Sequence, residues 1–93
     1  MTQTLYSIYD SVSQLHTAPA PFVNEATAIR SFANLINNDD SPYAINYRDY
    51  SLFRIGEWKD SAGTVTPFPA PEFVVSGRDV LQRGDEEDVR NSI

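Results

Sequence analysis

Apolar residues recur at the spacing of an α-helix in one stretch of the chain. The resulting stripe consists of Ala28, Ile29, Phe32, Leu35 and Ile36. Ahead of the stripe, Asn24 is a suitable N-cap, and Glu25 places a negative charge in the first turn, where it suits the helix dipole. The run NNDDSP supplies turn-forming residues after the stripe. The pattern predicts an amphipathic helix over residues 25–37.

Two segments, one on each side of this helix, are typical of strands. Residues 4–11, TLYSIYDS, mix β-branched and aromatic side chains and carry apolar groups on both faces, as a buried strand does. Residues 50–58, YSLFRIGEW, alternate so that Phe53 and Ile55 are expected to face the core. Gly56 inside this strand predicts a bulge or a close backbone approach.

A hairpin is predicted to follow the second strand. Residues 60–63, DSAG, have the chemistry of a type I turn that ends in a left-handed glycine. The returning strand, TVTPF, contains Pro67, which cannot donate a hydrogen bond to a ladder, so this strand is expected at a sheet edge. Ser76 and Asp79 then form a capping-box pattern that predicts a helical turn through Leu81.

The remaining segments are expected to be irregular. Residues 12–22, VSQLHTAPAPF, contain two prolines, and His16 is interpreted as a solvated loop residue. Residues 41–50, SPYAINYRDY, have no clean period and are interpreted as a loop. Beyond Arg83 the acidic stretch is too poor in apolar residues to pack and is expected to be mobile.

The order of these elements predicts an α+β fold. We expect a small β-α-β-β domain over residues 1–77, with one amphipathic helix on a three-stranded mixed sheet and a C-terminal β-hairpin. If the first two strands are neighbours, the helix between them would make them parallel through a right-handed crossover. Residues 78–93 would form a short helical turn and an acidic mobile tail. One sheet face would stay uncovered as an interaction surface, and its candidate residues are Leu5, Tyr9, Leu52 and Trp58.

Composition and charge narrow the class of protein. The chain has 93 residues and no cysteine, which excludes disulfides and thiolate zinc sites and fits a reducing compartment. No segment looks like an export signal or a membrane span, so a soluble cytoplasmic protein is expected. The net charge of −6 repels phosphate backbones at long range, although four of the acids lie at residues 85–88. Any contact with nucleic acid must therefore be local.

Motifs for catalysis and metal binding are missing from the sequence. It contains no glycine-rich phosphate loop, no calcium loop and no nucleophile elbow beside its single histidine. We therefore expect no enzyme activity, no catalytic residue, no metal and no cofactor.

Cations and aromatic residues gather in the predicted hairpin and in the segment before it. Trp and Tyr can stack on unpaired bases while Arg and Lys hold phosphates, which is how sheet proteins bind single strands. The candidate nucleic-acid-binding residues are Arg48, Arg54, Trp58, Lys59, Tyr47 and Tyr50. The alternative is a purely structural hairpin, in which Trp58 packs in a core or a dimer interface and Arg54 pairs with a nearby acid.

The ordered motifs resemble the small nonstructural protein of gokushovirus-type phages, which are single-stranded DNA microviruses (Microviridae). The resemblance rests on YSIYDS, PF before the helix, AIRSFANLIN and RDYSLFRIGEWKDSAGTVTPFPAPE. It implies a nonstructural phage protein of the host bacterial cytoplasm that is often labelled DNA-binding and has no agreed catalytic residues or cofactors. Lys59 and Asp60 depart from the pair of acids expected before the turn, which leaves partner specificity open.

Residues and resemblance together predict a non-enzymatic phage protein, expected to be a homodimer. It would act in viral single-stranded DNA genome synthesis or packaging by binding single-stranded DNA or the replication machinery. The alternative is a protein-protein interaction module that contacts the replication initiator or the procapsid and never touches nucleic acid. The net charge of −6 favours that alternative.

Overall fold

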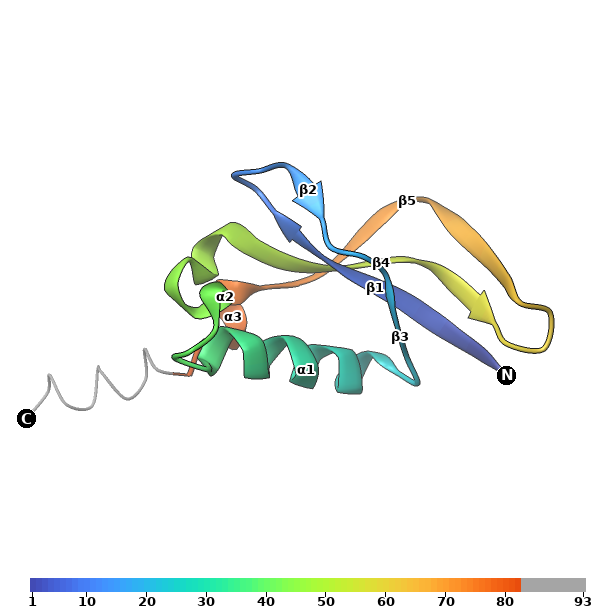
Figure 1. The fold of residues 1–93 in the computed structure, drawn as a ribbon, viewed down its shortest axis with the longest axis horizontal. Helices are drawn as coiled ribbons and strands as arrows, with labels where there is room; N and C mark the ends of the chain where they lie inside the picture. Colours follow the sequence, from blue (N-terminus) through green and yellow to red (C-terminus); the bar gives the residue numbers. More distant parts are fainter. Residues whose placement is uncertain (83–93) are drawn as a thin grey trace, which may run out of the picture.

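The computed structural model describes residues 1–82, in which one long helix lies against one face of a curled antiparallel sheet (Figure 1). The strands are β1 (Thr2–Asp10), β2 (Leu15–His16), β3 (Ala20–Phe22), β4 (Tyr50–Lys59) and β5 (Thr64–Ser76). The helices are α1 (Glu25–Asn37), α2 (Pro42–Ile45), the 3-10 helix η1 (Tyr47–Asp49) and α3 (Gly77–Val80). The α+β class is confirmed. The tail at residues 85–88 lies outside the described residues.

The sheet is antiparallel throughout, so the prediction of a three-stranded mixed sheet is wrong. The strand order is β2-β1-β4-β5, and β3 also pairs with β1. The reason lies in residues 12–22, where β2 and β3 return the chain to the start of β1 before α1 begins (Figure 1). Helix α1 then runs back along β1, so β4 begins where β1 ended and the two strands pair antiparallel.

Helix α1 has the predicted bounds, Glu25–Asn37, and its apolar stripe forms the core with the facing sheet. The Asn24 side chain caps it by accepting a hydrogen bond from the Thr27 backbone N–H at 2.9 Å. The buried core consists of Tyr6, Ala28, Phe32, Ile36 and Leu52. Each of these residues is at most 3% exposed, so the helix covers its face of the sheet tightly.

The segment predicted as a loop at residues 41–50 instead contains α2 and η1. Ser41 caps α2 by accepting a hydrogen bond from the Tyr43 backbone N–H, and the proline that follows it begins the helix. The ring of Tyr43 then meets that of Tyr50 edge to face, with centroids 4.8 Å apart. Elements this short have no periodic signal, which is why the sequence pattern did not show them.

A bulge in β4 decides which side chains of the hairpin point to each face of the sheet. Arg54 pairs with Tyr6 and Gly56 with Leu5, so Ile55 has no partner on β1. The predicted irregularity at Gly56 is confirmed, and a Cβ atom at Gly56 would lie 2.6 Å from the Thr66 carbonyl oxygen.

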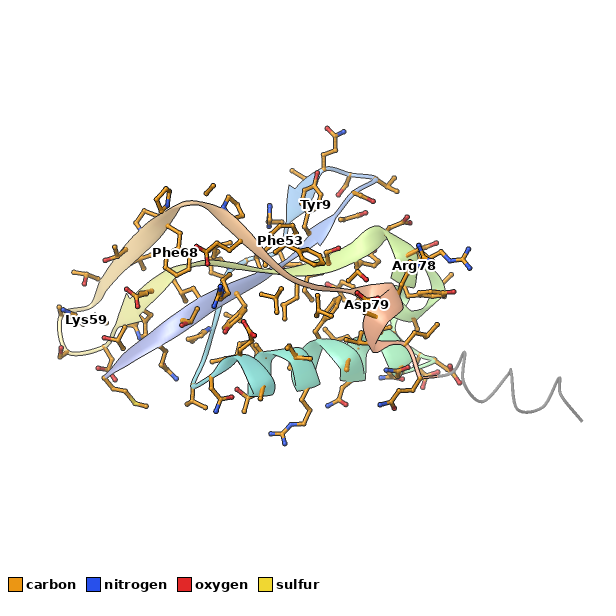
Figure 2. The ribbon with its side chains drawn as sticks, turned by 180° about the vertical axis from the view of Figure 1, so that it is seen from behind. Tyr9, Phe53, Lys59, Phe68, Arg78 and Asp79 are labelled. Atoms are coloured by element: carbon orange, nitrogen blue, oxygen red, sulfur yellow. The ribbon has the colours of Figure 1, made fainter. Side chains whose placement is uncertain are left out.

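Strand β5 lies at the sheet edge, as Pro67 predicted. Residues 68–71 arch away from β4 between Pro67 and Glu72, and Figure 2 shows Phe68 on the concave side of this arch. Gly63, in the turn, has a φ of 68°, which confirms the predicted left-handed glycine. The predicted helical turn is α3, whose N-cap Ser76 accepts a hydrogen bond from the Asp79 N–H.

Candidate functional site

The sheet face turned away from α1 is called the open face here, and it is assigned from the strand register. Leu52 belongs to the core beneath α1, and its neighbour Phe53 therefore points to the open face. The prediction that Phe53 faces the core is wrong, because β4 carries apolar residues on both faces and alternation alone could not choose between them. The bulge at Ile55 then brings Trp58 onto the same face as Phe53.

Arg54 lies on the opposite face and is held by acids. Its guanidinium nitrogens lie 3.0 Å from a Glu72 carboxylate oxygen and 3.5 Å from one of Glu25. Its Nε is buried without a hydrogen-bond partner in the described part of the chain. The positive charge of Arg54 is therefore matched by two carboxylates and is not free to hold a phosphate.

The other candidate nucleic-acid residues fall into two separate groups. Trp58 is half-buried and Lys59 exposed at the hairpin end of β4, where Figure 2 labels Lys59. At the other end, the exposed Arg48 places its guanidinium carbon 5.4 Å from the centroid of the Tyr47 ring. Tyr47 and Tyr50 pack against the core. The ends of this ten-residue strand lie about 30 Å apart, so the structure does not bring the six residues together.

The candidate interface residues also lie on both faces of the sheet. Leu52 is buried in the core at 3% exposure, so it cannot line an uncovered surface. Leu5 falls on the open face but is only 6% exposed. Tyr9 and Trp58 are half-buried on the open face.

Four aromatic rings form a row across the open face, with one ring from each strand of the order β2-β1-β4-β5. This aromatic row consists of His16, Tyr9, Phe53 and Phe73. Neighbouring centroids lie 4.8 Å apart for Tyr9 and His16, 5.9 Å for Tyr9 and Phe53, and 5.8 Å for Phe53 and Phe73. Figure 2 shows Tyr9 and Phe53 on the side of the sheet away from α1. Phe73, on the edge strand, is 58% exposed.

The open face is uncharged along its three long strands. The register places on it Gln3, Leu5, Ser7 and Tyr9 of β1, Ser51, Phe53, Gly56 and Trp58 of β4, and Val65, Pro67, Phe73 and Ser76 of β5. The acids of these strands, Asp10, Glu57 and Glu72, alternate onto the helix-covered face. The acidic side chains of these three strands therefore lie on the face of the sheet opposite the aromatic row.

Ser7 contacts the aromatic row through the imidazole of His16. Its side-chain oxygen lies 2.7 Å from Nδ1 of His16, and Ser7 itself is only 2% exposed. His16 also meets the Phe53 ring at a centroid distance of 5.5 Å. His16 is exposed, as expected, but its interpretation as a loop residue is wrong, because β2 pairs with β1 and places His16 beside Tyr9.

Sequence reasoning missed His16, Phe53 and Phe73 as members of the candidate site. A strand of two residues gives no alternation, and the face of Phe73 depends on bulges in β4 and β5 that the sequence does not locate. The segment that begins at Phe73 does offer a signal, because FVVS (residues 73–76) is mainly apolar and continues an edge strand. An exposed aromatic residue in such a strand is unusual and points to a contact surface.

Two tyrosines on the helix-covered side have raised pKa values. Burial raises the pKa of the Tyr6 hydroxyl above its usual value, and the Glu25 carboxylate adds to the rise while Arg54 opposes it. Burial also raises the pKa of Tyr50, with a smaller contribution from Asp10. Both side chains are therefore neutral at pH 7 and behave there as packing groups.

A cavity of about 140 Å³ lies between α1 and β1, beneath residues 17–20. Its walls are mainly apolar, with Tyr6, Phe22 and Phe32 among them. Within residues 1–82, no three His, Cys, Asp or Glu side chains gather as a metal site requires. No helix in the same range has the length and apolar character needed to span a bilayer.

The comparison with protein families identifies the relatives of this chain. Residues 3–80 match the family described as Phage ORF5 protein. The chain belongs to this family. The match covers most of the described residues, including every strand of the aromatic row. The searches of curated proteins and of solved structures found no match.

Proposed function

We propose that this phage protein is non-enzymatic and binds single-stranded DNA through the aromatic row, in viral genome synthesis or packaging in the host bacterial cytoplasm. One observation carries the proposal: four rings cross an uncharged face, and the ring at the edge, Phe73, is 58% exposed. Sheet proteins that bind single strands stack two or three bases on such aromatic residues.

The dimensions of the row suit unpaired bases. With strands about 4.8 Å apart, four strands span about 14 Å, which is enough for two or three bases laid across the sheet. Stacking tolerates any base, since every base has a π-face, and contributes about 1–3 kcal/mol per base. Binding of this kind does not require the net positive charge that the chain lacks.

The charge distribution predicts weak salt dependence. Arg54 is paired with two acids, and Lys59 lies at the hairpin end, far from the row. With one or two phosphate contacts, the logarithm of the affinity should fall with the logarithm of the salt concentration at a slope of about −1. A slope near −5 would mean that a basic surface, and not the aromatic row, holds the strand.

The test is fluorescence anisotropy with a labelled thymidine homopolymer, for the wild type and for Phe73→Ala. Loss of one stacking ring should weaken binding about 5-fold to 100-fold. Val23→Ala is the matched control, because Val23 is 59% exposed and lies between β3 and α1, away from the row. Equal losses in both variants, or no binding by the wild type at low salt, would contradict the proposal.

A second candidate function is a protein-protein interaction module for the replication initiator or the procapsid. It is favoured by the net charge of −6 and by the edge-to-face contacts of the row, which leave apolar surface exposed on Phe73. The same two variants distinguish the functions. In this case Phe73→Ala would lose the phage protein partner in a pull-down with purified components, and the wild type would not bind the labelled strand.

The homodimer expected from the small core remains a prediction. Self-association through the open face would cover Phe73. Sedimentation equilibrium of the wild type and of Phe73→Ala tests it, and a wild-type monomer at micromolar concentration would contradict it.

A further inference from the structure

His16 is the member of the aromatic row that can carry a charge. It lies on β2, at the opposite end of the row from Phe73, and its side chain is exposed to solvent. None of the open-face residues of β1, β4 and β5 is charged. Within residues 1–82, a positive charge on the row can therefore come only from this imidazole.

The ring of His16 is fixed in position by its neighbours. Nδ1 lies 2.7 Å from the Ser7 hydroxyl oxygen, and Ser7 is buried at 2% exposure, so this partner is firmly placed. The rings of Tyr9 and Phe53 contact the imidazole at centroid distances of 4.8 Å and 5.5 Å. Because Nδ1 is occupied by Ser7, Nε2 is the nitrogen left for a ligand.

We propose that His16 is the phosphate contact of the aromatic row, with Nε2 donating a hydrogen bond to a backbone phosphate of bound single-stranded DNA. Ser7 is the positioning residue that holds Nδ1. This inference rests on the function proposed above and adds its ionic contact. In the imidazolium form both nitrogens carry a proton, so Nδ1 donates to the Ser7 oxygen while Nε2 donates to the phosphate. The contact then becomes a charge-assisted hydrogen bond.

The contact makes DNA binding dependent on pH. The titratable groups around His16 are Tyr9 on β1 and, around the adjoining hollow, Asp10 at the end of β1, Tyr43 on α2 and Tyr50 on β4. The Asp10 carboxylate accepts a hydrogen bond from the Val12 backbone N–H. Carboxyl and phenol groups change charge well outside the range from about pH 5.5 to pH 8, in which imidazoles commonly do. We expect affinity for the strand to rise as the pH falls through this range.

The N-terminal amine is the other group to control. Its nitrogen lies 2.7 Å from an Asp60 carboxylate oxygen, at the hairpin end of the sheet. Acetylating Met1 removes this positive charge and leaves His16 unchanged. A pH dependence that disappears on acetylation would assign the effect to the amine and overturn the proposal.

The experiment measures binding of the thymidine homopolymer at about pH 5.5 and pH 8. Wild-type affinity should be about 5-fold higher at the lower pH, the factor expected for one exposed ionic contact. His16→Gln should bind with the weaker affinity at both pH values. His16→Arg should bind with the stronger affinity at both, since its charge does not titrate. Circular dichroism checks that each variant is folded.

A strand with a neutral methylphosphonate backbone separates phosphate contact from base stacking. If the imidazolium contacts phosphate, wild-type binding to this strand should not depend on pH. A persistent pH dependence would mean that His16 acts on the bases, and it would overturn the phosphate assignment. Binding of the ordinary strand without any pH dependence would reject the role of His16 while leaving the stacking function in place.

The role of Ser7 is tested through the imidazole itself. In Ser7→Ala, the ¹⁵N chemical shifts of the His16 ring report which nitrogen carries the proton in the neutral form. We expect the tautomer ratio to change, and affinity at about pH 5.5 to fall about 3-fold while some pH dependence remains. Unchanged ring shifts would exclude Ser7 as a positioning residue.

Discussion

Arg54 and Trp58 lie four positions apart in one strand and yet on opposite faces of the sheet. In a regular strand, residues at this spacing share a face. The unpaired Ile55 adds one residue between them, so Arg54 pairs with Tyr6 above the helix and Trp58 pairs with Gln3 on the open face. The bulge therefore separates a cation from the indole with which the sequence pattern had grouped it.

This separation predicts different effects of two substitutions. Trp58→Ala should lower affinity for single-stranded DNA about 5-fold, because the indole extends the stacking surface about 13 Å along β1 from the aromatic row. Arg54→Ala should leave that affinity within about 2-fold and instead lower the free energy of unfolding by about 0.5–1 kcal/mol, since its ion pairs with Glu25 and Glu72 are half-exposed. Anisotropy and urea unfolding measure the two effects. A large loss of binding in Arg54→Ala would place the DNA on the helix side.

The parts of the fold that the sequence predicts are those fixed by local chemistry. The stripe from Ala28 to Ile36 and the cap at Asn24 define α1, and Gly63 and Pro67 define the turn and the edge strand. Each of these signals lies within a few residues of the feature that it predicts.

The parts that were missed depend on pairing between distant segments. The strand Leu15–His16 is too short to show alternation, and it becomes a strand only because Tyr9 and Asp10 offer a free edge. Because β2 and β3 return the chain to the start of β1, β4 pairs with β1 antiparallel, whereas a parallel pair was expected. The site was missed for the same reason, since the aromatic row takes one ring from each of four strands.

Gly56 is predicted to be intolerant of any side chain. A Cβ atom there would lie 2.6 Å from the Thr66 carbonyl oxygen and 3.1 Å from the Pro67 Cα, both of them backbone atoms of β5. Gly56→Ala should therefore lower the free energy of unfolding by about 2–3 kcal/mol, the usual effect of overpacking. Urea denaturation measures this, with Ser61→Ala in the exposed turn as the control. A loss below about 0.5 kcal/mol would show that β5 can move away from β4 at little cost.

The two tight turns of the sheet provide a matched pair of substitutions. In each turn a backbone N–H donates to the carbonyl four residues earlier, from Gln14 to Asp10 and from Gly63 to Lys59. Gln14 and Gly63 both have positive φ values, of 63° and 68°. Because a side chain is disfavoured in this region, Gln14→Gly should stabilise the fold by about 0.5–1 kcal/mol, and Gly63→Gln should destabilise it by a similar amount. Shifts of the urea midpoint in the same direction for both variants would contradict this.

Alkaline pH should destabilise the protein through Tyr6. The pKa of Tyr6 is raised in the folded state, chiefly by burial and also by Glu25, so folding favours the neutral phenol. A group with a raised pKa contributes its full stabilisation below the pKa of the unfolded chain, about 10 for tyrosine, and loses it as the pH rises through the folded pKa. Tyr6→Phe removes this ionisation and keeps the ring that packs edge to face against Phe22. Melting temperatures from about pH 8 to pH 11 should therefore fall less for Tyr6→Phe than for the wild type. Parallel curves would mean that Tyr6 ionises without opposing folding.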